Sequence, residues 1–458
     1  MKITEISVKN LFGIFNHKIT LNNEERITII HGPNGFGKTA ILRLIDGFFN
    51  SHYFKLRKIP FSQFEIKLSN NETIEIVKEL TDYKNSSSPE IVFYLHKPHK
   101  PLSKLQSFSL HKLKNSHNLQ SLTGSIENLI PGLERISSEE WAYIPTNEII
   151  SSEDVIERFG DYLPSEFFKI FPIREEPDWL KEIKNSIHIR LVESQRLLNI
   201  VTTRSSRRYE ASSSMFPTVS AYSDELAKLM QDKFKEYGTT SQSLDRTFPV
   251  RVVKQPPSVK ITDEQLRQQL KELEITRSRL IEVGLLDEDR EAEFQIQPQD
   301  IDESTKNALS VYVEDVEKKL NVFSEITQKI ELLRKIINSK FAYSYKKISF
   351  SKEKGFVFST RYNNSLTNSK QLLPTELSSG EQHELVLLYE LLFKVEPNSL
   401  VLIDEPELSL HVGWQVQFLK DLQEIVKLAN LDILMATHSP DIIQDRWDLT
   451  VELKGIEE

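Results

Sequence analysis

The sequence predicts an α/β protein with a mixed sheet, flanking helices, an antiparallel β-subdomain and an inserted helical hairpin or coiled coil. Three observations support this fold class. Short, largely apolar runs at 26–30, 400–403 and 432–436 have the composition of buried parallel strands. Residues 60–98 contain runs of strand-forming residues separated by polar turns. Residues 261–342 carry apolar side chains at helical spacing.

The composition is that of a globular protein with a core of its own. The 458 residues suffice for two or three domains, and 39% of them are hydrophobic and 27% charged. The absence of cysteine excludes disulfides, a thiolate nucleophile and a cysteine-ligated zinc site. No apolar run approaches the roughly 20 residues of a membrane span, and the first residues alternate like a strand. We therefore expect a cytoplasmic protein without a membrane partner.

The first motif is a phosphate-binding loop, His31–Thr39, whose last eight residues read G-x-x-x-x-G-K-T. A strand-like run precedes it and a helical pattern follows at 40–45, which is the context that the motif requires. Glycines let successive N–H groups face one anion, and the helix N-terminus adds its positive end. The Lys38 amine can reach phosphates, and the Thr39 hydroxyl suits Mg²⁺. The candidate nucleotide-binding residues are Gly32, Pro33, Asn34, Gly35, Phe36, Gly37, Lys38, Thr39 and Ala40.

The segment 1–30 predicts an antiparallel strand pair that leads into the nucleotide-binding strand, with a turn near Asn22 and Asn23. Phe12 and Phe15 lie between these strands. They either stack on a nucleotide base or pack in the core, and the pattern favours the core.

The next segment predicts an antiparallel sheet beside the nucleotide core. Runs at 64–68 and 73–77 form a predicted hairpin, and a third strand is expected at 91–95. Residues 100–180 are weakly patterned. We expect this segment to be partly helical with long loops, and we assign it no role.

The run 187–196 predicts another strand, with Gln195 near its end. The polar stretch 203–215 has the composition of an exposed basic loop. Its residues Arg204, Arg207 and Arg208 either touch nucleic-acid phosphates or are simply solvated, and a solvated loop is favoured. The net charge of −9 argues against a surface coated with nucleic acid but leaves a local basic groove open.

Residues 261–342 predict two paired helices. Thr262 and Gln265 form a capping box that opens the first helix, and Gly284 ends it. The second helix follows an acidic connector at 287–302. The apolar stripes comprise Leu266, Leu270, Leu273 and Leu280 in the first helix, and Leu309, Val313, Val316, Leu320, Phe323, Ile330 and Ile337 in the second. This hairpin is either a bundle on the domain body or an arm that docks a partner or dimerises.

The C-terminal part contains the remaining candidate residues for metal binding and catalysis. Strands are expected at 344–362, a helix at 385–393, and a buried strand at 400–403 that ends in two acids. Asp404 is suited to hold Mg²⁺, and Glu405 to act as general base for an attacking water. His438 follows the strand at 432–436 and is suited to contact a γ-phosphate.

The order of these motifs resembles the ABC-type ATPases. Leu377–Glu381 is similar to their signature loop, with Ser379 where the family usually has glycine, and 409–411 and His438 are similar to the D-loop and switch histidine. The resemblance implies an ABC-ATPase head that hydrolyses ATP with Mg²⁺ in a head-to-tail dimer. The implied assignments are catalytic Lys38, Glu405 and His438, metal-binding Thr39, Asp404 and Gln195, and a signature acting in trans through Ser378, Ser379, Gly380 and Glu381.

The wide spacing of the motifs resembles one branch of that superfamily. Gly380 lies 343 positions after Gly37, with a helical hairpin before the signature, as in SMC, Rad50, RecF and OLD proteins. Transporter ATPases hold the two motifs much closer. The sequence ends at Glu458, shortly after His438, so we expect no TOPRIM nuclease of the OLD type. The expected domains are an N-terminal lobe (1–200), a basic/polar linker (201–260), the hairpin insert (261–342) and a C-terminal lobe (343–458).

The C-terminal motifs also resemble the ATPase subunits of bacterial anti-phage systems, PARIS first and Septu next. This resemblance implies an ATP-driven switch that senses infection and controls a separately encoded effector, a nuclease or a toxin. Self-association, as a dimer or a larger homo-oligomer, is expected, and binding of nucleic acid is left open. Two alternatives remain: a DNA-repair or chromosome-structure ATPase that acts directly on DNA, and an ATP-stabilised scaffold with negligible turnover.

Overall fold

The computed structural model describes most of the chain in two compact units. The described residues are 1–79, 90–98, 106–110, 130, 132–137, 140–144, 148–151, 155, 159, 176–192, 198–201, 214–254, 262–287, 302–360 and 371–455. Unit 1 comprises Met1–Phe216 and Lys394–Glu458, and unit 2 comprises Pro217–Phe393. The predicted residues Gln195, Arg204, Arg207 and Arg208 lie outside the described residues.

Unit 1 contains a parallel sheet built from the predicted apolar runs. Its order is β11 (Ile189–Val192), β17 (Leu400–Asp404), β18 (Asp432–Ala436), β3 (Ile27–His31) and β19 (Thr450–Glu452). Every neighbouring pair is parallel. The three central strands are buried nearly throughout, which explains their continuous apolar sequences and confirms the predicted strands.

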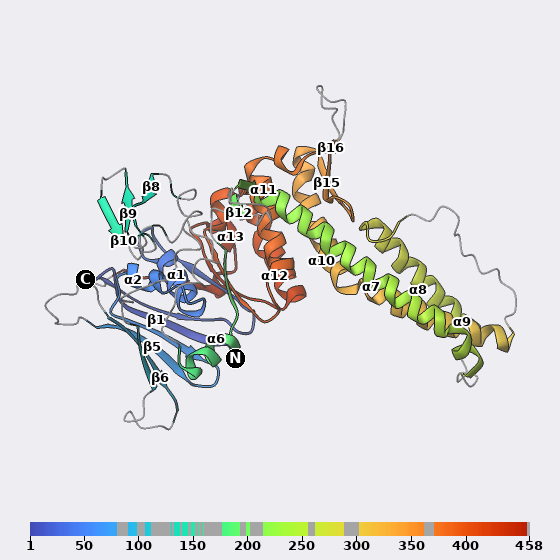
Figure 1. The fold of residues 1–458 in the computed structure, drawn as a ribbon, viewed down its shortest axis with the longest axis horizontal. Coiled ribbons are helices and arrows are strands. Elements are labelled where there is room, and N and C mark those ends of the chain that lie inside the picture. The colour runs from blue at the N-terminus through green and yellow to red at the C-terminus, as the bar shows by residue number, and fades with distance from the viewer. Residues whose placement is uncertain are drawn as a thin grey trace. The chain divides into compact units, whose positions relative to one another are not determined.

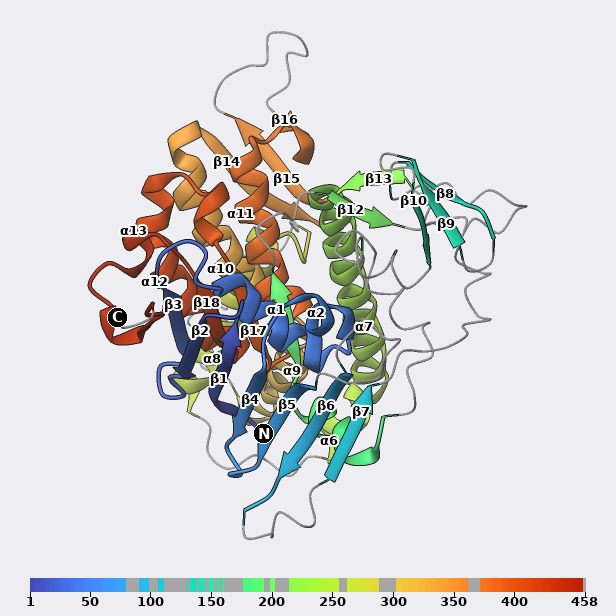
Figure 2. The ribbon, with the colours of Figure 1, turned by 90° about the vertical axis from the view of Figure 1, so that its left-hand side faces the viewer.

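A second, antiparallel sheet in unit 1 confirms the predicted β-subdomain (Figure 2). Its order is β2 (Phe15–Thr20), β1 (Ile3–Leu11), β4 (Gln63–Leu68), β5 (Thr73–Glu79), β6 (Glu90–His96) and β7 (Gln106–Leu110). The strand pair predicted near the N-terminus is β1 and β2, and the predicted hairpin is β4 and β5.

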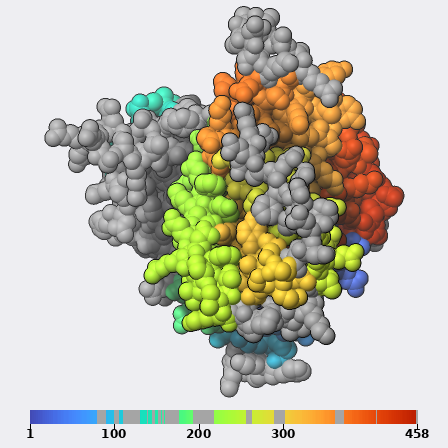
Figure 3. Space-filling view, turned by 90° about the vertical axis from the view of Figure 1, so that its right-hand side faces the viewer, coloured from blue at the N-terminus to red at the C-terminus, as the bar shows by residue number. Residues whose placement is uncertain are grey.

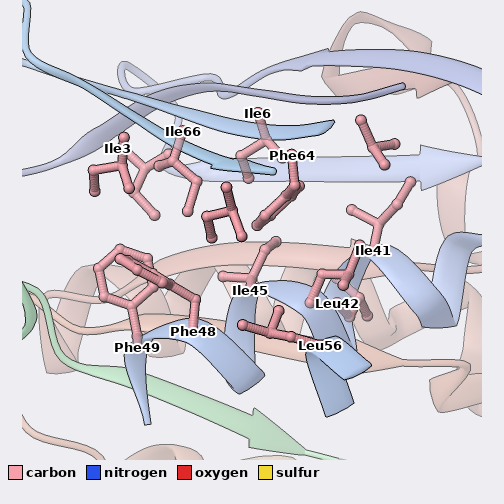
Figure 4. Close-up of a cluster of buried hydrophobic side chains, with 14 of the residues drawn as sticks. Ile3, Ile6, Ile41, Leu42, Ile45, Phe48, Phe49, Leu56, Phe64 and Ile66 are labelled. Carbon is pink, nitrogen blue, oxygen red and sulfur yellow. The ribbon is translucent and has the colours of Figure 1, made fainter. Parts of the chain in front are cut away.

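The core of unit 1 lies between this sheet and helices α1 (Lys38–Phe49) and α2 (Tyr53–Lys58). Figure 4 shows Ile6 and Phe64 of the sheet facing Ile41 and Ile45 of α1. Because α1 begins inside the phosphate-binding loop, burial of its apolar face fixes the position of that loop.

The described residues between 100 and 180 include strands as well as helical residues at Val155, Phe159 and 178–180. They include β7 and a three-stranded antiparallel sheet of β8 (Leu133–Arg135), β9 (Glu140–Tyr143) and β10 (Glu148–Ser151). Trp141 and Ile150 are buried on this sheet, which gives the short strands a core that periodicity over so few residues does not reveal. Helix α6 (Asp178–Ser186) is the helical segment that precedes β11.

The other described elements of unit 1 are short apart from one helix. They are β12 (Leu198–Val201), paired with β13 (Ser214–Pro217), the 3₁₀ turns η7 (Pro406–Ser409) and η8 (Trp447–Leu449), and helices α12 (Val412–Ala429) and α13 (Pro440–Ile443).

Unit 2 begins with a 37-residue helix, α7 (Thr218–Lys254), where the sequence indicated a polar linker (Figure 1). Its N-terminal third packs on β15 through Ser223. The Ser223 hydroxyl donates to Lys354 O at 2.7 Å and accepts the Phe356 N–H at 2.9 Å. A Cβ on Gly355 would lie 1.8 Å from Ser223 O, so only glycine permits this approach. This packing stabilises a helix whose remaining surface is largely polar and exposed.

The predicted helical hairpin forms, with a third helix beside it. Helix α8 (Asp263–Glu282) starts at the predicted capping box and ends before Gly284. The expected second helix is two helices, α9 (Glu303–Asn321) and α10 (Ser324–Phe341), because the helix is interrupted at Val322 and Phe323. Helix α9 lies beside both α7 and α8, and Figure 3 shows α7 in green next to α9 in yellow.

Unit 2 ends in a small sheet and the helix that carries the signature-like sequence. The 3₁₀ turn η4 (Ala342–Ser344) leads into a sheet of β14 (Lys346–Ser351), β15 (Gly355–Thr360) and β16 (Gln371–Leu372). The 3₁₀ turn η5 (Pro374–Glu376) then precedes helix α11 (Ser379–Tyr389). Helix α11 continues as a π-helical turn, η6 (Glu390–Lys394). The first strands are those predicted at 344–362. A fully buried ion pair joins Lys340 of α10 to Glu384 of α11. None of the helices that the structure describes is both long and apolar enough to cross a membrane.

Candidate active site

The candidate site lies where three parallel strands of unit 1 end. In the sheet register Asp404 is opposite Ala436, and Ala436 is opposite Ile30. The ladder continues past the strands, because Glu405 N–H donates to Ala436 O at 2.9 Å and Thr437 N–H to Ile30 O at 3.1 Å. The carboxyl ends of neighbouring parallel strands share one edge, which is where open α/β sheets bind ligands. Segments from opposite ends of the sequence therefore meet here.

The phosphate-binding loop depends on glycine at Gly35 and Gly37, which adopt φ values of 85° and 89°. A Cβ on Gly37 would lie 2.4 Å from Leu11 Cδ2, so a side chain there would displace Leu11 as well as strain the backbone at its positive φ. Gly37 is also the N-cap of α1 and offers no side-chain acceptor to the first N–H groups of that helix. Free N–H groups at a helix N-terminus after a glycine loop favour an anion such as phosphate.

The Lys38 side chain is buried, with 4% of its surface exposed. Its ammonium donates to Gly32 O at 2.7 Å and Pro33 O at 2.9 Å, and it lies 3.3 Å from His438 Nδ1. Burial lowers the pKa of Lys38 below its ordinary value, and the nearby carboxylates of Glu405, Glu407 and Asp404 oppose this shift without cancelling it.

Thr39 and Asp404 form the part of the site that fits a metal ion. The Thr39 hydroxyl donates to Asp404 Oδ1 at 3.0 Å, and Asp404 is buried. Mg²⁺ prefers oxygen ligands and commonly takes only one or two protein groups besides phosphate oxygens and water. The described residues contain no group of three or more histidine, cysteine or acidic side chains placed to hold a metal ion.

Glu405 and His438 complete the charged part of the site. Glu405 adopts a left-handed conformation with φ 44°, which is uncommon for a residue with a side chain and is found at functional sites. His438 Nε2 lies 3.1 Å from Glu405 Oε1. Since the Lys38 ammonium can only donate, His438 Nδ1 is the acceptor and Nε2 carries the proton that is donated to Glu405. The imidazole therefore connects the lysine to the glutamate.

These groups surround an open pocket of about 350 Å³ in unit 1. It is lined by Phe12, Asn34, Gly35, Gly37, Lys38, Thr39, Ala40, Glu405 and His438. The structure thus brings together the phosphate-binding loop, the paired acids and the histidine that the sequence singled out.

Phe12, Phe15 and Phe36 lie differently from one another. Phe12 lines the pocket and exposes 42% of its surface, so the preference for core packing is wrong for this residue. Phe15 packs against the core and against the Phe36 ring, at 5.1 Å between centroids. Phe36 O accepts from His17 Nε2 at 2.9 Å, so Phe36 stabilises the loop from behind. Burial lowers the pKa of His17, and this hydrogen bond opposes the shift.

The signature-like residues lie in unit 2, at the start of α11. The Ser378 hydroxyl accepts from Glu381 N–H at 3.4 Å, and Glu381 Oε2 accepts from Ser378 N–H at 2.8 Å. Ser344 and Lys346 also donate to the Glu381 carboxylate, each at 2.7 Å. This network leaves Ser378 and Ser379 exposed at the helix N-terminus.

Glu381 is ionised in this network. Burial raises the pKa of Glu381, but the hydrogen bonds from Lys346, Ser344 and Ser378 N–H outweigh burial and hold the pKa below its ordinary value. The helix begins at Ser379, earlier than the apolar run from Leu385 indicated, because this polar capping box starts it.

Sequence reasoning gave no role to Glu407, which accepts the backbone N–H of His438 at 2.6 Å. The available signal is a third acid that follows Asp404 and Glu405 after a single proline. Pairing between loops after different strands cannot be read from sequence spacing, so the contact emerges only in the fold.

Comparison with known proteins finds one family and a group of remote structural neighbours. The family model described as AAA ATPase domain matches residues 1–443. No curated protein matches the chain significantly. Similar solved structures include an SMC head domain with an extended coiled coil, bound to the C-terminal domain of ScpA, from Pyrococcus furiosus (10% identity, TM-score 0.34, 99% of this chain and 94% of that chain covered).

Two further SMC head domains show the same level of likeness. They are the head domain from Thermotoga maritima (10% identity, TM-score 0.32, coverage 97% and 92%) and a head bound to the C-winged helix domain of ScpA (10% identity, TM-score 0.30, coverage 97% and 91%). Superpositions this loose carry no functional weight, so function must be inferred from the residues of the site.

Proposed function

The chain belongs to the AAA ATPase domain family, and from this premise we propose that it hydrolyses ATP at composite sites in a head-to-tail dimer. The observation that carries the proposal is the pocket of unit 1. It unites a phosphate-binding loop, a hydroxyl–carboxylate pair suited to Mg²⁺, and a glutamate held by a histidine.

Each residue has a distinct chemical task in this proposal. The Lys38 ammonium and the N–H groups at the start of α1 bind the phosphates. Thr39 and Asp404 would hold Mg²⁺, which neutralises phosphate charge when bound. Glu405 accepts the proton of the attacking water, and His438 fixes the carboxylate at 3.1 Å.

Phe12 supplies a surface for the nucleotide base. It lines the pocket with a phenyl ring, and 42% of the residue's surface is exposed. An aromatic face binds any base by stacking, so Phe12 contributes affinity more than base specificity.

Two exposed regions support dimerisation. Leu408, Val412 and Val416 are exposed large apolar residues at four-residue intervals, in the segment that directly follows Glu405. In unit 2, Ser378 and Ser379 are exposed at the N-terminus of α11. We propose that the signature residues Ser378, Ser379, Gly380 and Glu381 of one copy act on the nucleotide held by the other.

Mixing two inactive variants tests the composite site. Lys38→Ala removes phosphate binding, and Ser379→Asp places a negative charge where the partner's γ-phosphate would lie. An aspartate at the first turn of α11 is compatible with the helix dipole, so Ser379→Asp should fold. Ser379→Asn is the matched control, because it has nearly the same size and no charge.

Each variant alone should lose turnover, while an equimolar mixture should regain part of the wild-type rate. In a mixed dimer one site combines an intact Lys38 from one copy with an intact Ser379 from the other. If half the dimers are mixed and each has one good site, roughly a quarter of wild-type activity returns. A mixture as inactive as its components would overturn the composite site, and a wild-type chain without ATP turnover would overturn the proposed ATPase.

We further propose that this ATPase is the switch of a bacterial anti-phage system and acts on a separately encoded effector. The amino-acid sequence at 378–411 and 436–440 supports this assignment, because it resembles that of the ATPase subunits of such systems. Phage plaquing on cells that express the chain with its neighbouring genes tests it. Protection should be lost with Lys38→Ala, and protection that survives this variant would contradict an ATP-driven switch.

A further inference from the structure

Glu407 connects two loops of the site without lining the pocket. It lies in η7, the 3₁₀ turn that follows Glu405, and its Oε1 accepts the backbone N–H of His438 at 2.6 Å. At 2.6 Å this is a short hydrogen bond between a backbone donor and a side-chain acceptor. Glu407 thereby ties the loop after β17 to the loop after β18.

The position of the His438 main chain matters because its ring has a partner on each side. Nδ1 lies 3.3 Å from the Lys38 ammonium, and Nε2 lies 3.1 Å from Glu405 Oε1. A shift of the backbone at this residue would break both contacts together. The bond from Glu407 therefore fixes the distance between the imidazole and the glutamate.

The second oxygen of Glu407 has an energetic cost. Oε2 is buried and has no hydrogen-bond partner among the described residues. A buried polar atom without a partner costs roughly 1–3 kcal/mol, and such atoms in native proteins are often retained for function. An apolar side chain at this position would avoid the cost but could not hold the His438 amide.

We infer that Glu407 is a positioning residue for ATP hydrolysis, acting through the backbone of His438 to hold the imidazole against Glu405. The inference rests on the proposed ATPase function and deepens it. Glu407 contacts the His438 amide, so Glu407 acts on the site through that backbone. Its role depends on the reach of its side chain and on an acceptor oxygen, and not on its charge.

Three substitutions separate reach from charge. Glu407→Gln keeps the length and one acceptor oxygen but removes the charge. Glu407→Asp keeps the charge but is one methylene too short for the 2.6 Å bond. Glu407→Ala removes both. Glu396→Gln and Glu396→Asp are matched controls, because the Glu396 side chain is 75% exposed in the same unit.

Steady-state ATPase assays should show a split between kcat and KM. Glu407→Asp and Glu407→Ala should lower kcat about 10- to 100-fold, as is typical when an outer-shell partner is lost, with KM for ATP changed about threefold or less. Glu407→Gln should stay within about threefold of wild type. Loss of kcat in Glu407→Gln with retention in Glu407→Asp would overturn the inference, as would wild-type kcat in all three.

Amide hydrogen exchange followed by mass spectrometry provides a readout that is independent of turnover. In the nucleotide-free chain, the peptide that contains His438 should exchange faster in Glu407→Asp and Glu407→Ala but not in Glu407→Gln. Unchanged protection in all variants would overturn the contact. If the variants show the expected exchange pattern but the wild-type chain does not turn over ATP, the proposed function is overturned while the contact between Glu407 and His438 stands. The two failures are therefore distinguishable.

Discussion

The two regions that carry the candidate chemistry are built in opposite ways. In unit 1 the pocket is assembled from distant segments: Lys38, Asp404 and His438 come together through parallel strands and hydrogen bonds. In unit 2 the start of α11 is built locally, because Ser378 and Glu381 cap the same helix, with Ser344 and Lys346 bonded to that cap.

The difference teaches where each function resides. The pocket of unit 1 has a candidate phosphate cradle, a general-base candidate and a hydroxyl–carboxylate pair within one unit, so the proposed function assigns nucleotide binding to unit 1. The helix start in unit 2 has exposed hydroxyls without such a cradle, as expected of a surface that acts on a neighbouring molecule. Substitutions in unit 1 should therefore change binding or chemistry, while those in unit 2 should leave ATP binding intact.

The largest effect is expected from Glu405→Gln in unit 1. Loss of the general base should lower kcat by about 10²- to 10⁴-fold, while ATP affinity is kept because glutamine has the same size. Light scattering after gel filtration should show the dimer persisting with ATP and Mg²⁺. Glu396→Gln, on an exposed side chain, is the control. Unchanged turnover would remove Glu405 from the base role and break the comparison at its strongest point.

Lys38→Ala should abolish most nucleotide binding. It removes the buried cation that we propose binds the phosphates and leaves nearby carboxylates without a counter-charge. This change should cost about 2–5 kcal/mol and weaken affinity roughly 30- to several-thousand-fold. Titration with a fluorescent ATP analogue measures it. Lys18→Ala, on an exposed side chain of the same unit, should bind normally. Wild-type affinity in Lys38→Ala would contradict the loop assignment.

Phe12→Ala sharpens the comparison by dividing the pocket into a phosphate part and a base part. Loss of base stacking, worth about 1–3 kcal/mol, should weaken ATP binding about 5- to 150-fold. Inorganic tripolyphosphate has no base, so its affinity should stay unchanged. Phe12→Trp should keep ATP binding. Equal ATP affinity in Phe12→Ala and wild type would return Phe12 to a purely structural role.

Glu381→Gln in unit 2 should give the smallest effect on ATP binding, and its main effect should be on stability. Losing charge-assisted hydrogen bonds should lower the free energy of unfolding by about 1–3 kcal/mol at pH 7, with ATP affinity unchanged. The folded-state pKa of Glu381 lies below the ordinary value of 4.5, so its contribution is present above that pH and is lost as pH falls through the folded pKa.

Urea unfolding at pH 7 and at pH 4 tests this dependence. The difference between wild type and Glu381→Gln should shrink at the lower pH. A difference that grows on acidification would mean that the carboxyl is not ionised in the folded state. A fall in ATP affinity would break the comparison between the two units.

The sequence predicted the parallel strands and the loop well because both have strong local signals. The strands that deliver Asp404 and His438 are apolar throughout, and the glycine loop requires particular backbone conformations. Placing these motifs at one edge needed only the rule that parallel strands share their carboxyl ends.

The failures have a common physical cause, which is stabilisation by tertiary contacts. Helix α7 has a polar surface over most of its length and contains Gly238 and Pro249, so its own sequence argues against a helix. Packing of Ser223 against Gly355 stabilises it instead. Phe12 was assigned to the core because sequence spacing does not show that the adjacent pocket exposes it.

The buried pair of Lys340 and Glu384 has a mechanical consequence. Helix α10 and helix α11, which begins at the exposed serines, share two charges that are fully shielded from water. Separating Lys340 from Glu384 would leave an unpaired charge in the interior, at a cost of about 3–5 kcal/mol. A force or rotation applied to α10 is therefore transmitted to the serines at the start of α11, because the two helices move together.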